Sequence, residues 1–388
     1  MTHPPTETLH VAMLGSMPPT GGISAYCLEL ARAVARRTNV DFMAFRRLYP
    51  AWLHPAGRLR DESPPDVAGP RLRVHRQLTW YNPFGWLWHG LRTPGRLLHA
   101  QWWSWPLGPA YVAFLLMAKL RGRPVVLTMH NVSAHEDGLL PRLMDRLVLR
   151  LADHVIVHSR RNAEQLRRKT RLPVDRISRI PHGVLGFFAE GAPTARQARR
   201  RLGIAPDRRT LLFFGSIRPY KGLDVLLEAV AKLAGGGDDL LLLIAGKPWG
   251  DRHACRRQID ALGLGDNVRL HLDFVPADQV APFFQAAELV VLPYRHFESQ
   301  TGVGSLALAF AKPMIVTNVG ALPDLVDDPR CVVPPDDPDA LAEAVRQCLR
   351  DPDRLRRMAE ASRRIARTCG WDEIADRTVE LYRRLLAP

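Results

Sequence analysis

Short apolar runs alternate with segments of helical spacing along the first half of the chain. LHVAMLG (9–15) is followed by a Gly-rich turn and by ISAYCLELARAVARR (23–37), whose apolar positions recur at helical spacing. Two later runs, RPVVLTMHN (123–131) and DHVIVHS (153–159), are compact and rich in Val. Such continuous apolar runs are typical of strands that are buried on both faces of a parallel sheet.

The second half restarts the same alternation after a Pro-rich, polar stretch at 190–209. TLLFFGSIRPYKG (210–222) predicts a strand and a loop, and LDVLLEAVAKLAGG (223–236) predicts an amphipathic helix. Further strands are expected within 239–250, 268–275, 289–295, 312–318 and 331–338. The alternation predicts an α/β protein with two doubly wound, Rossmann-like domains that face each other across a cleft.

Length and composition agree with a globular protein of two domains. The chain has 388 residues, of which 46% are hydrophobic and 24% charged. Its five cysteines are scattered without CxxC spacing, which predicts neither disulfides nor a zinc site and favours a reducing, cytoplasmic location. The N-terminus lacks the layout of a signal peptide, and PLGPAYVAFLLMAKL is too short an apolar stretch to span a bilayer.

Positive charge is concentrated in the first half. Residues 1–200 hold 29 Lys and Arg against 13 Asp and Glu, together with seven of the nine Trp. A basic surface rich in Trp suits an anionic membrane or a phosphate-bearing partner, whereas the alternative is an Arg-rich composition with the Trp side chains in the core. No helix-turn-helix, zinc or RNA-binding motif accompanies the charge, so a nucleic-acid partner is not expected.

Glycines and a few polar side chains gather at the predicted strand ends. Gly-rich turns let backbone N–H groups approach a diphosphate, cations neutralise charge on a leaving diphosphate, and a carboxylate accepts hydrogen bonds from sugar hydroxyls. These are the parts needed to break a sugar–phosphate bond without a metal. The residues are Gly21, Gly22, His130, Arg218, Lys221, Gly246, Lys247 and Glu298.

Glu298 has two interpretations. It lies just before SQTGV, where a helix is expected to begin, and a helix N-terminus attracts anions. The carboxylate therefore either caps that helix or faces a ligand whose phosphates bind the same amides.

Several motifs together resemble the retaining glycosyltransferases of family four (glycosyl transferases group 1), which have the GT-B fold. The motifs are PPTGGISAYCLELARAV, FGSIRPYKGLDVLLEAV, LIAGKPWG, ESQTGVGSLALAFAKPMIVTNVGALPDLV and GWDEIADRTVELYRRLL. The resemblance covers nearly the whole chain, except for the Trp-rich stretch 77–105, which is expected to be the variable acceptor region. It implies an acceptor-binding domain at 1–190, a nucleotide-sugar-binding domain at 191–366 and a final helix at 367–388 that packs back on the first domain.

The resemblance also implies roles for individual residues. Gly21 and Gly22 would lie by the donor phosphates, and His130 would lie near the transferred sugar. Lys221 would bind the diphosphate with Arg218, Gly246 and Lys247 nearby, and Glu298 would contact the sugar. The amides of Thr301, Gly302 and Val303 would face phosphate and sugar. The catalytic residues would then be His130, Glu298 and Lys221, with no metal and no cofactor, because the nucleotide-sugar is a substrate.

Three positions depart from the family pattern. Leu306 stands where a second Glu usually contacts ribose, and an apolar side chain cannot accept those hydrogen bonds. Ser216 stands where Arg is usual, with Arg218 as a substitute, and Ala311 stands where Gly is usual.

Two functions remain open from these residues. The favoured one is an active enzyme that transfers sugar to a lipid-linked saccharide or glycolipid in polysaccharide or envelope biosynthesis. It would work in the cytoplasm, bound peripherally to the anionic inner face of the plasma membrane. The alternative is a degenerate relative that binds or scaffolds a sugar nucleotide without turnover, for which Ser216 and Leu306 are the reason.

Overall fold

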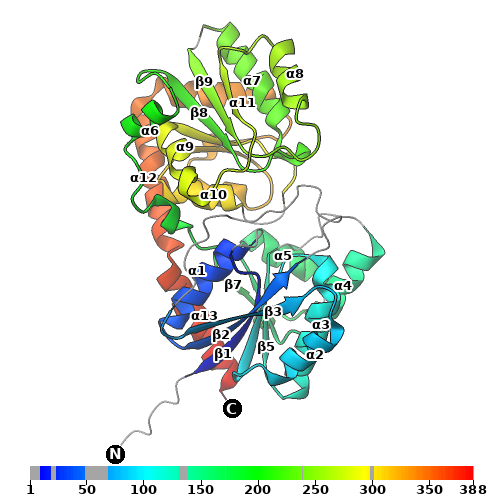
Figure 1. Cartoon of the computed structure of the whole chain (residues 1–388). Coiled ribbons are helices and arrows are strands. Elements are labelled where there is room, and N and C mark those ends of the chain that lie inside the picture. The colour runs from blue at the N-terminus through cyan, green and yellow to red at the C-terminus, as the bar shows by residue number, and fades with distance from the viewer. Residues whose placement is uncertain are drawn as a thin grey trace, which may run out of the picture. The chain divides into compact units, whose positions relative to one another are not determined.

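The computed structural model describes residues 9–18, 23–48, 69–130, 138–170, 172–237, 239–297 and 301–387. The chain folds into two units (Figure 1). Residues up to Gly183 together with those from Gly370 onward form the first unit, and Val184–Cys369 form the second. The final helix therefore belongs to the first unit, although it follows the second unit in the sequence.

The first unit is built on a sheet of seven parallel strands in the order β3-β2-β1-β4-β5-β6-β7. The order reverses between β1 and β4, which is the switch point of a doubly wound sheet. The strands are β1 (His10–Gly15), β2 (Asn39–Arg47), β3 (Leu72–Thr79), β4 (Leu97–Trp102), β5 (Val125–Met129), β6 (His154–Val157) and β7 (Ile177–Arg179).

Helices cover both faces of this sheet (Figure 1). Alternate strand residues point to opposite faces, so Val11 and Met13 pack with α1 and α13, while Ala12 and Leu14 pack with α3 and α4. Arg37, which follows α1, forms an ion pair with Asp376 of α13 and so links these two helices. The helices are α1 (Ser24–Ala35), α2 (Pro83–Arg92), α3 (Gly108–Leu120), α4 (Leu139–Leu151), α5 (Arg160–Lys169) and α13 (Trp371–Leu386).

The second unit repeats the plan with six parallel strands in the order β10-β9-β8-β11-β12-β13. Its switch point lies between β8 and β11. The strands are β8 (Arg209–Phe214), β9 (Leu240–Ala245), β10 (Val268–His271), β11 (Leu289–Leu292), β12 (Met314–Thr317) and β13 (Val332–Val333).

Helices again lie on both faces of the second sheet. Leu211 and Phe213 belong to a core shared with α7, α11 and α12, whereas Phe214 packs its ring on Phe284 of α9 at 5.0 Å. The helices are α6 (Ala195–Arg201), α7 (Leu223–Gly235), α8 (Ala254–Ala261), α9 (Val280–Ala286), α10 (Gly302–Ala309), α11 (Pro338–Arg350) and α12 (Pro352–Thr368). Short 3-10 turns complete the unit, among them η5 (Pro219–Lys221) and η7 (Leu322–Leu325).

The sequence predicted no helix in the polar stretch at 190–209, but the structure has one there. This helix is α6, which begins with a capping box in which Thr194 and Gln197 satisfy each other's backbone N–H groups. The run of arginines hid this helix, because its buried face is small and includes only Ala198 and Arg199.

The tryptophans divide between the two interpretations drawn from the sequence. Trp86 and Trp102 are buried, whereas Trp80 and Trp88 are exposed, and Trp52 lies outside the described residues. None of the helices that the structure describes is long and apolar enough to cross a bilayer.

Candidate functional site

Lys221 lies at the switch point of the second unit. It ends the 3-10 turn η5 that follows β8, and only 7% of its surface is exposed. Its Nζ is 5.5 Å from the centre of the Tyr294 ring, which comes from the loop after β11. Within the described residues Nζ makes no hydrogen bond or ion pair, and the face of this ring is its one attractive electrostatic contact.

The charge on Lys221 is destabilised by its surroundings. Burial, and secondarily the nearby Arg218 guanidinium, lower the pKa of Lys221 to about 7. The Arg218 guanidinium is itself held over the Trp249 ring at 3.9 Å. Two cations therefore share one place, and an anion bound there would relieve the repulsion between them.

The first turn of α10 lies beside Lys221. A Cβ on Gly215 would lie 3.1 Å from Lys221 Nζ and 3.1 Å from the Val303 side chain, so all three meet at one point. Thr301 is the N-cap of α10, but its side chain does not cap the helix, because its hydroxyl lies 3.3 Å from the Tyr294 hydroxyl instead. The amides of Gly302 and Val303 thus open the helix next to a buried cation, which is a favourable arrangement for a phosphate.

Two glycines let the loops after β8 and β9 approach each other. Gly215 has φ +88°, and Gly246 has φ +149°. A Cβ on Gly246 would lie 2.1 Å from the Gly215 carbonyl oxygen, so only glycine fits at this contact. Ile217 then donates its N–H to the Lys247 carbonyl at 3.0 Å, which ties the loop of Arg218 and Lys221 to the loop of Gly246 and Lys247.

The departures from the family pattern lie close to these residues in the chain. Ser216 is exposed in the loop after β8, and Leu306 is buried within α10. Ala311 has φ +50°, a left-handed conformation that disfavours any residue with a Cβ, and this explains why glycine suits the position. Gly21, Gly22 and Glu298 lie outside the described residues, so both interpretations of Glu298 remain predictions.

His130 follows β5 in the first unit and is buried. Its backbone N–H donates to the Trp102 carbonyl at 2.9 Å, which continues the pairing of β5 with β4. Its Nε2 is 3.0 Å from Gln101 Oε1, and its Nδ1 is 3.4 Å from His158 Nε2. Because an amide oxygen only accepts, Nε2 carries the proton in the neutral ring and Nδ1 carries a lone pair.

His130 belongs to a cluster of three histidines. All three rings pack around Tyr26, whose ring centre is 4.7 Å from that of His130, 5.3 Å from that of His158 and 4.7 Å from that of His182. Burial lowers the pKa of all three histidines, to about 3 for His158 and about 4 for His182. His130 therefore stays neutral around neutral pH.

A chain of buried polar groups continues from His130 to the C-terminal helix. Gln101 Nε2 is 3.1 Å from His99 Nε2, and His99 Nδ1 is 2.5 Å from the Tyr382 hydroxyl of α13. Thr128 also contacts His99 Nε2, at 2.7 Å. The sequence analysis missed these residues; the one signal was that His158, like His130, directly follows a buried strand.

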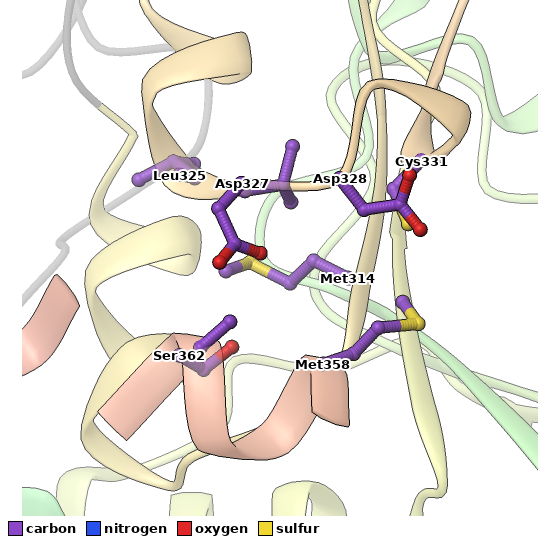
Figure 2. A pocket seen from close by; sticks show the side chains of 9 residues that line it. Met314, Leu325, Asp327, Asp328, Cys331, Met358 and Ser362 are labelled. Atoms are coloured by element: carbon purple, nitrogen blue, oxygen red, sulfur yellow. The ribbon is translucent and has the colours of Figure 1, made fainter. Parts of the chain in front are cut away.

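One cavity of the second unit lies apart from the predicted site and contains none of the residues expected there. It lies between the segment after η7 and helix α12, and Figure 2 shows Met314 of β12 in its middle. The described residues also contain no group of three His, Cys, Asp or Glu side chains placed to hold a metal ion. The lining residues are Met314, Leu325, Val326, Asp327, Asp328, Cys331, Met358, Ala361 and Ser362.

Comparison with known proteins places this chain in one family. The family "Glycosyltransferase Family 4" matches residues 20–184, and "Glycosyl transferases group 1" matches residues 194–365. The D-inositol 3-phosphate glycosyltransferase 1 of Catenulispora acidiphila is 31% identical over an alignment that covers 94% of this chain and 90% of that protein. The chain belongs to the group 1, family 4 glycosyltransferases, and it is a glycosyltransferase.

Solved structures show the same fold. The sucrose-phosphate synthase of Thermosynechococcus elongatus aligns with a TM-score of 0.75 at 22% identity, covering 97% of this chain and 99% of that one. The Anabaena protein Alr3699/HepE, solved with UDP-glucose, aligns with a TM-score of 0.72 at 17% identity, covering 97% and 100%. The two doubly wound units and the final helix that returns to the first unit are thus confirmed as the GT-B fold.

Proposed function

We propose that this glycosyltransferase is a retaining hexosyltransferase that takes its sugar from a nucleotide-sugar and needs no metal. The observation that carries the proposal is Lys221, a buried cation beside an N-terminus that Thr301 leaves uncapped. Such a place favours the diphosphate of a donor, because both the cation and the helix amides act on the same negative charge. The complex of HepE with UDP-glucose supports a donor of this class.

The proposed reaction uses the site to stabilise the leaving group. The bond between the sugar C1 and the diphosphate breaks, and the acceptor hydroxyl oxygen forms its bond to C1 on the same face. The acceptor proton leaves with the diphosphate. Lys221, Arg218 and the amides of Gly302 and Val303 hold the charge that develops on the diphosphate, which is the role a metal ion has in other transferases. His130 and Glu298 are proposed to contact the transferred sugar, and Gly21 and Gly22 the donor phosphates.

A thermal-shift panel of UDP-, GDP- and ADP-sugars tests the donor. At a free concentration of about 100 Kd, binding should stabilise the protein by roughly 2.7 kcal/mol. The shift should appear with one nucleotide and disappear in Lys221→Met, while Lys232→Met, which removes an exposed lysine paired with Asp339, should keep it. No shift with any sugar nucleotide would overturn the proposal. Transfer that stops in EDTA and returns with a divalent cation would overturn its metal-free part.

For the acceptor we propose a lipid-linked saccharide or a glycolipid, used at the anionic inner face of the plasma membrane during polysaccharide or envelope synthesis. The basic, partly exposed Trp-rich stretch supports this proposal. One solved structure of the same fold, WaaG, is described as involved in lipopolysaccharide biosynthesis, with a TM-score of 0.65 at 18% identity.

A soluble phosphorylated acceptor is the second candidate, because the relative from Catenulispora acidiphila is named for D-inositol 3-phosphate. A basic first unit also suits such an acceptor. Incubation with radiolabelled donor, membrane lipid extract and D-inositol 3-phosphate separates the two candidates. Label in the organic phase supports the lipid acceptor, and label only in the aqueous product supports the soluble one.

A further inference from the structure

Helix α2 exposes an apolar stripe to solvent. The stripe consists of Phe84, Leu87, Trp88 and Leu91, which recur at i, i+3, i+4 and i+7 and so lie within an arc of about 100°. Phe84 is 83% exposed and Trp88 is 54% exposed. A surface helix of a globular protein normally turns such a stripe toward the core, so its exposure indicates a binding surface.

The opposite side of α2 accounts for its packing on the first unit. Trp86 is buried and donates its indole N–H to the Thr79 carbonyl at 2.6 Å. Gly90 lies against α3, where a Cβ would come within 3.0 Å of the Met117 side chain. The local sequence also fixes the helix start, because Asn82 accepts a hydrogen bond from the Gly85 N–H and Pro83 occupies the first turn. The stripe is therefore not needed to pack α2 on the first unit.

The apolar surface continues from α2 onto α3. Phe84, Leu87, Trp88 and Leu91 line a shallow groove together with Met117 of α3. Leu116 and Leu120, one helical turn apart on α3, are also exposed. The surface is thus formed by two packed helices, and not by one side chain.

The charge around this surface identifies its partner. Residues 69–130, which include α2 and α3, contain eight Lys and Arg and no Asp or Glu. Arg92 is exposed and stacks on Trp88, with its guanidinium 3.7 Å from the ring centre. Arg121 is exposed as well and reaches the Leu91 carbonyl at 2.6 Å. Cations thus lie at the edge of the apolar surface, and the segment that forms this surface contains no Asp or Glu.

We propose that the stripe of α2, with the exposed leucines of α3, docks this enzyme on a bilayer that contains anionic lipid. Phe84, Leu87, Trp88 and Leu91 enter the boundary between headgroups and acyl chains, and Arg92 and Arg121 contact lipid phosphates. The indole of Trp88 suits this boundary, since its ring is apolar and its N–H is polar. The inference deepens the proposed function, because a lipid-linked acceptor is presented at such a surface.

Vesicle sedimentation tests the proposal with the full-length protein. Wild type should sediment with phosphatidylglycerol-containing vesicles at low salt, and less with phosphatidylcholine alone or at high salt. The double variant Phe84→Ser, Trp88→Ser should lose binding by about tenfold or more. Phe274→Ser, which removes an exposed aromatic of the second unit, is the matched control and should bind like wild type. Unchanged donor-induced thermal shifts in both variants show that they are folded.

Three results would overturn the docking surface. They are absence of wild type from the vesicle pellet, equal loss in the Phe274 control, and self-association of wild type without vesicles that the double variant abolishes. In each of them the donor-induced thermal shift decides the proposed function separately. A normal shift leaves that function standing while the docking surface fails.

Discussion

The two polar sites of this enzyme are built in opposite ways. His130 of the first unit and Lys221 of the second unit both follow a buried strand, and both are themselves buried. His130 Nε2 donates to Gln101 Oε1, whereas its Nδ1 lone pair faces His158 Nε2. His158 Nε2 is also an acceptor, because His158 Nδ1 donates to the Ile180 carbonyl. In the described part of the chain Lys221 has no anionic partner: the Tyr294 ring lies 5.5 Å from Nζ, and Arg218 repels the charge. The His130 ring is thus held by a hydrogen bond without a ligand, whereas the charge on Lys221 becomes favourable only when an anion binds.

The difference shows what each site contributes. The hydrogen bond to Gln101 fixes the His130 ring and its tautomer before any substrate arrives, which is preorganisation. The buried charge of Lys221, for which the described residues supply no counter-charge, destabilises the ligand-free protein, and this energy is recovered when an anion binds. We therefore expect substitutions at the two sites to affect stability and binding in opposite ways.

Lys221→Met should have the largest effect. Loss of a buried cation from the diphosphate should reduce transferase kcat/KM by about 100-fold or more, and steady-state assays with the donor found in the thermal-shift panel measure it. The ligand-free variant should nevertheless be more stable by about 1–3 kcal/mol and melt at a higher temperature, because a buried charge that has no counter-charge among the described residues is removed.

Lys312 is the matched control for this effect on stability. It is another largely buried lysine of the second unit, but its Nζ donates to the Ala287 carbonyl at 2.9 Å. Lys312→Met should lower the melting temperature, because the carbonyl loses its donor. If both variants shift the melting temperature in the same direction, the contrast between the two lysines is wrong.

Low pH should have the second-largest effect, because it should lower the stability of the first unit. His158 and His182 have a folded-state pKa of about 3 and about 4, below the ordinary value of 6.5. Between these values the unfolded chain binds more protons than the folded chain, so the stability is fully present above pH 6.5 and falls as the pH drops toward 4. Urea titrations followed by Trp fluorescence should show a loss of at least about 2 kcal/mol between neutral pH and about pH 5. Constant stability over this range would show that the histidines are not held neutral.

Gln101→Leu should have an intermediate effect that is specific to the first unit. It removes the acceptor for His130 Nε2 and the donor to His99, so the His130 ring is free to change tautomer. We expect kcat to fall by about tenfold, the equivalent of one hydrogen bond, while the donor Kd stays unchanged. Thr128→Val, which touches only His99 among these groups, is the control and should keep most of its activity. An equal loss of donor affinity in Gln101→Leu would contradict separate roles for the two sites.

Ala311→Gly should have the smallest effect. The φ of +50° at Ala311 is unfavourable for a residue with a Cβ, so glycine should stabilise the second unit by about 1 kcal/mol. Differential scanning calorimetry measures the change, and kinetic constants should remain those of the wild type. A destabilised variant would show that the Ala311 methyl group makes compensating contacts.

Much of the fold could be predicted from the sequence, because β1, β5, β6 and most strands of the second sheet are continuous apolar runs. The strands β2, β3, β4 and β7 were not predicted. Polar side chains such as Arg47, Arg73 and Gln101 interrupt the pattern of the first three, and β7 has only three residues. Helix α2 was not predicted either. It carries the buried Trp86 and the exposed Trp88, so the presence of tryptophan alone could not tell core positions from surface positions.

Individual side chains of the sites could be predicted where a local sequence motif marks them. Lys221 and the N-terminus of α10 follow strands and lie next to glycines, so the sequence predicted them; the structure brings them together, and their roles stay predictions. Gln101 and His158 could not be found, because their approach to His130 depends on the register that pairs Gln101 with Thr128 and Thr128 with Ile156. Strand register across neighbouring strands is set by the whole sheet and not by any local motif.

Proton uptake on donor binding tests the central claim most directly. The ligand-free pKa of Lys221 is about 7, and a bound diphosphate should raise it. Calorimetric titration at about pH 8 in two buffers of different ionisation enthalpy should show uptake of about one proton per sugar nucleotide bound. Lys221→Arg, which is protonated at any such pH, should bind without uptake. Absence of uptake in the wild type, or equal uptake in the variant, would contradict a diphosphate site built around Lys221.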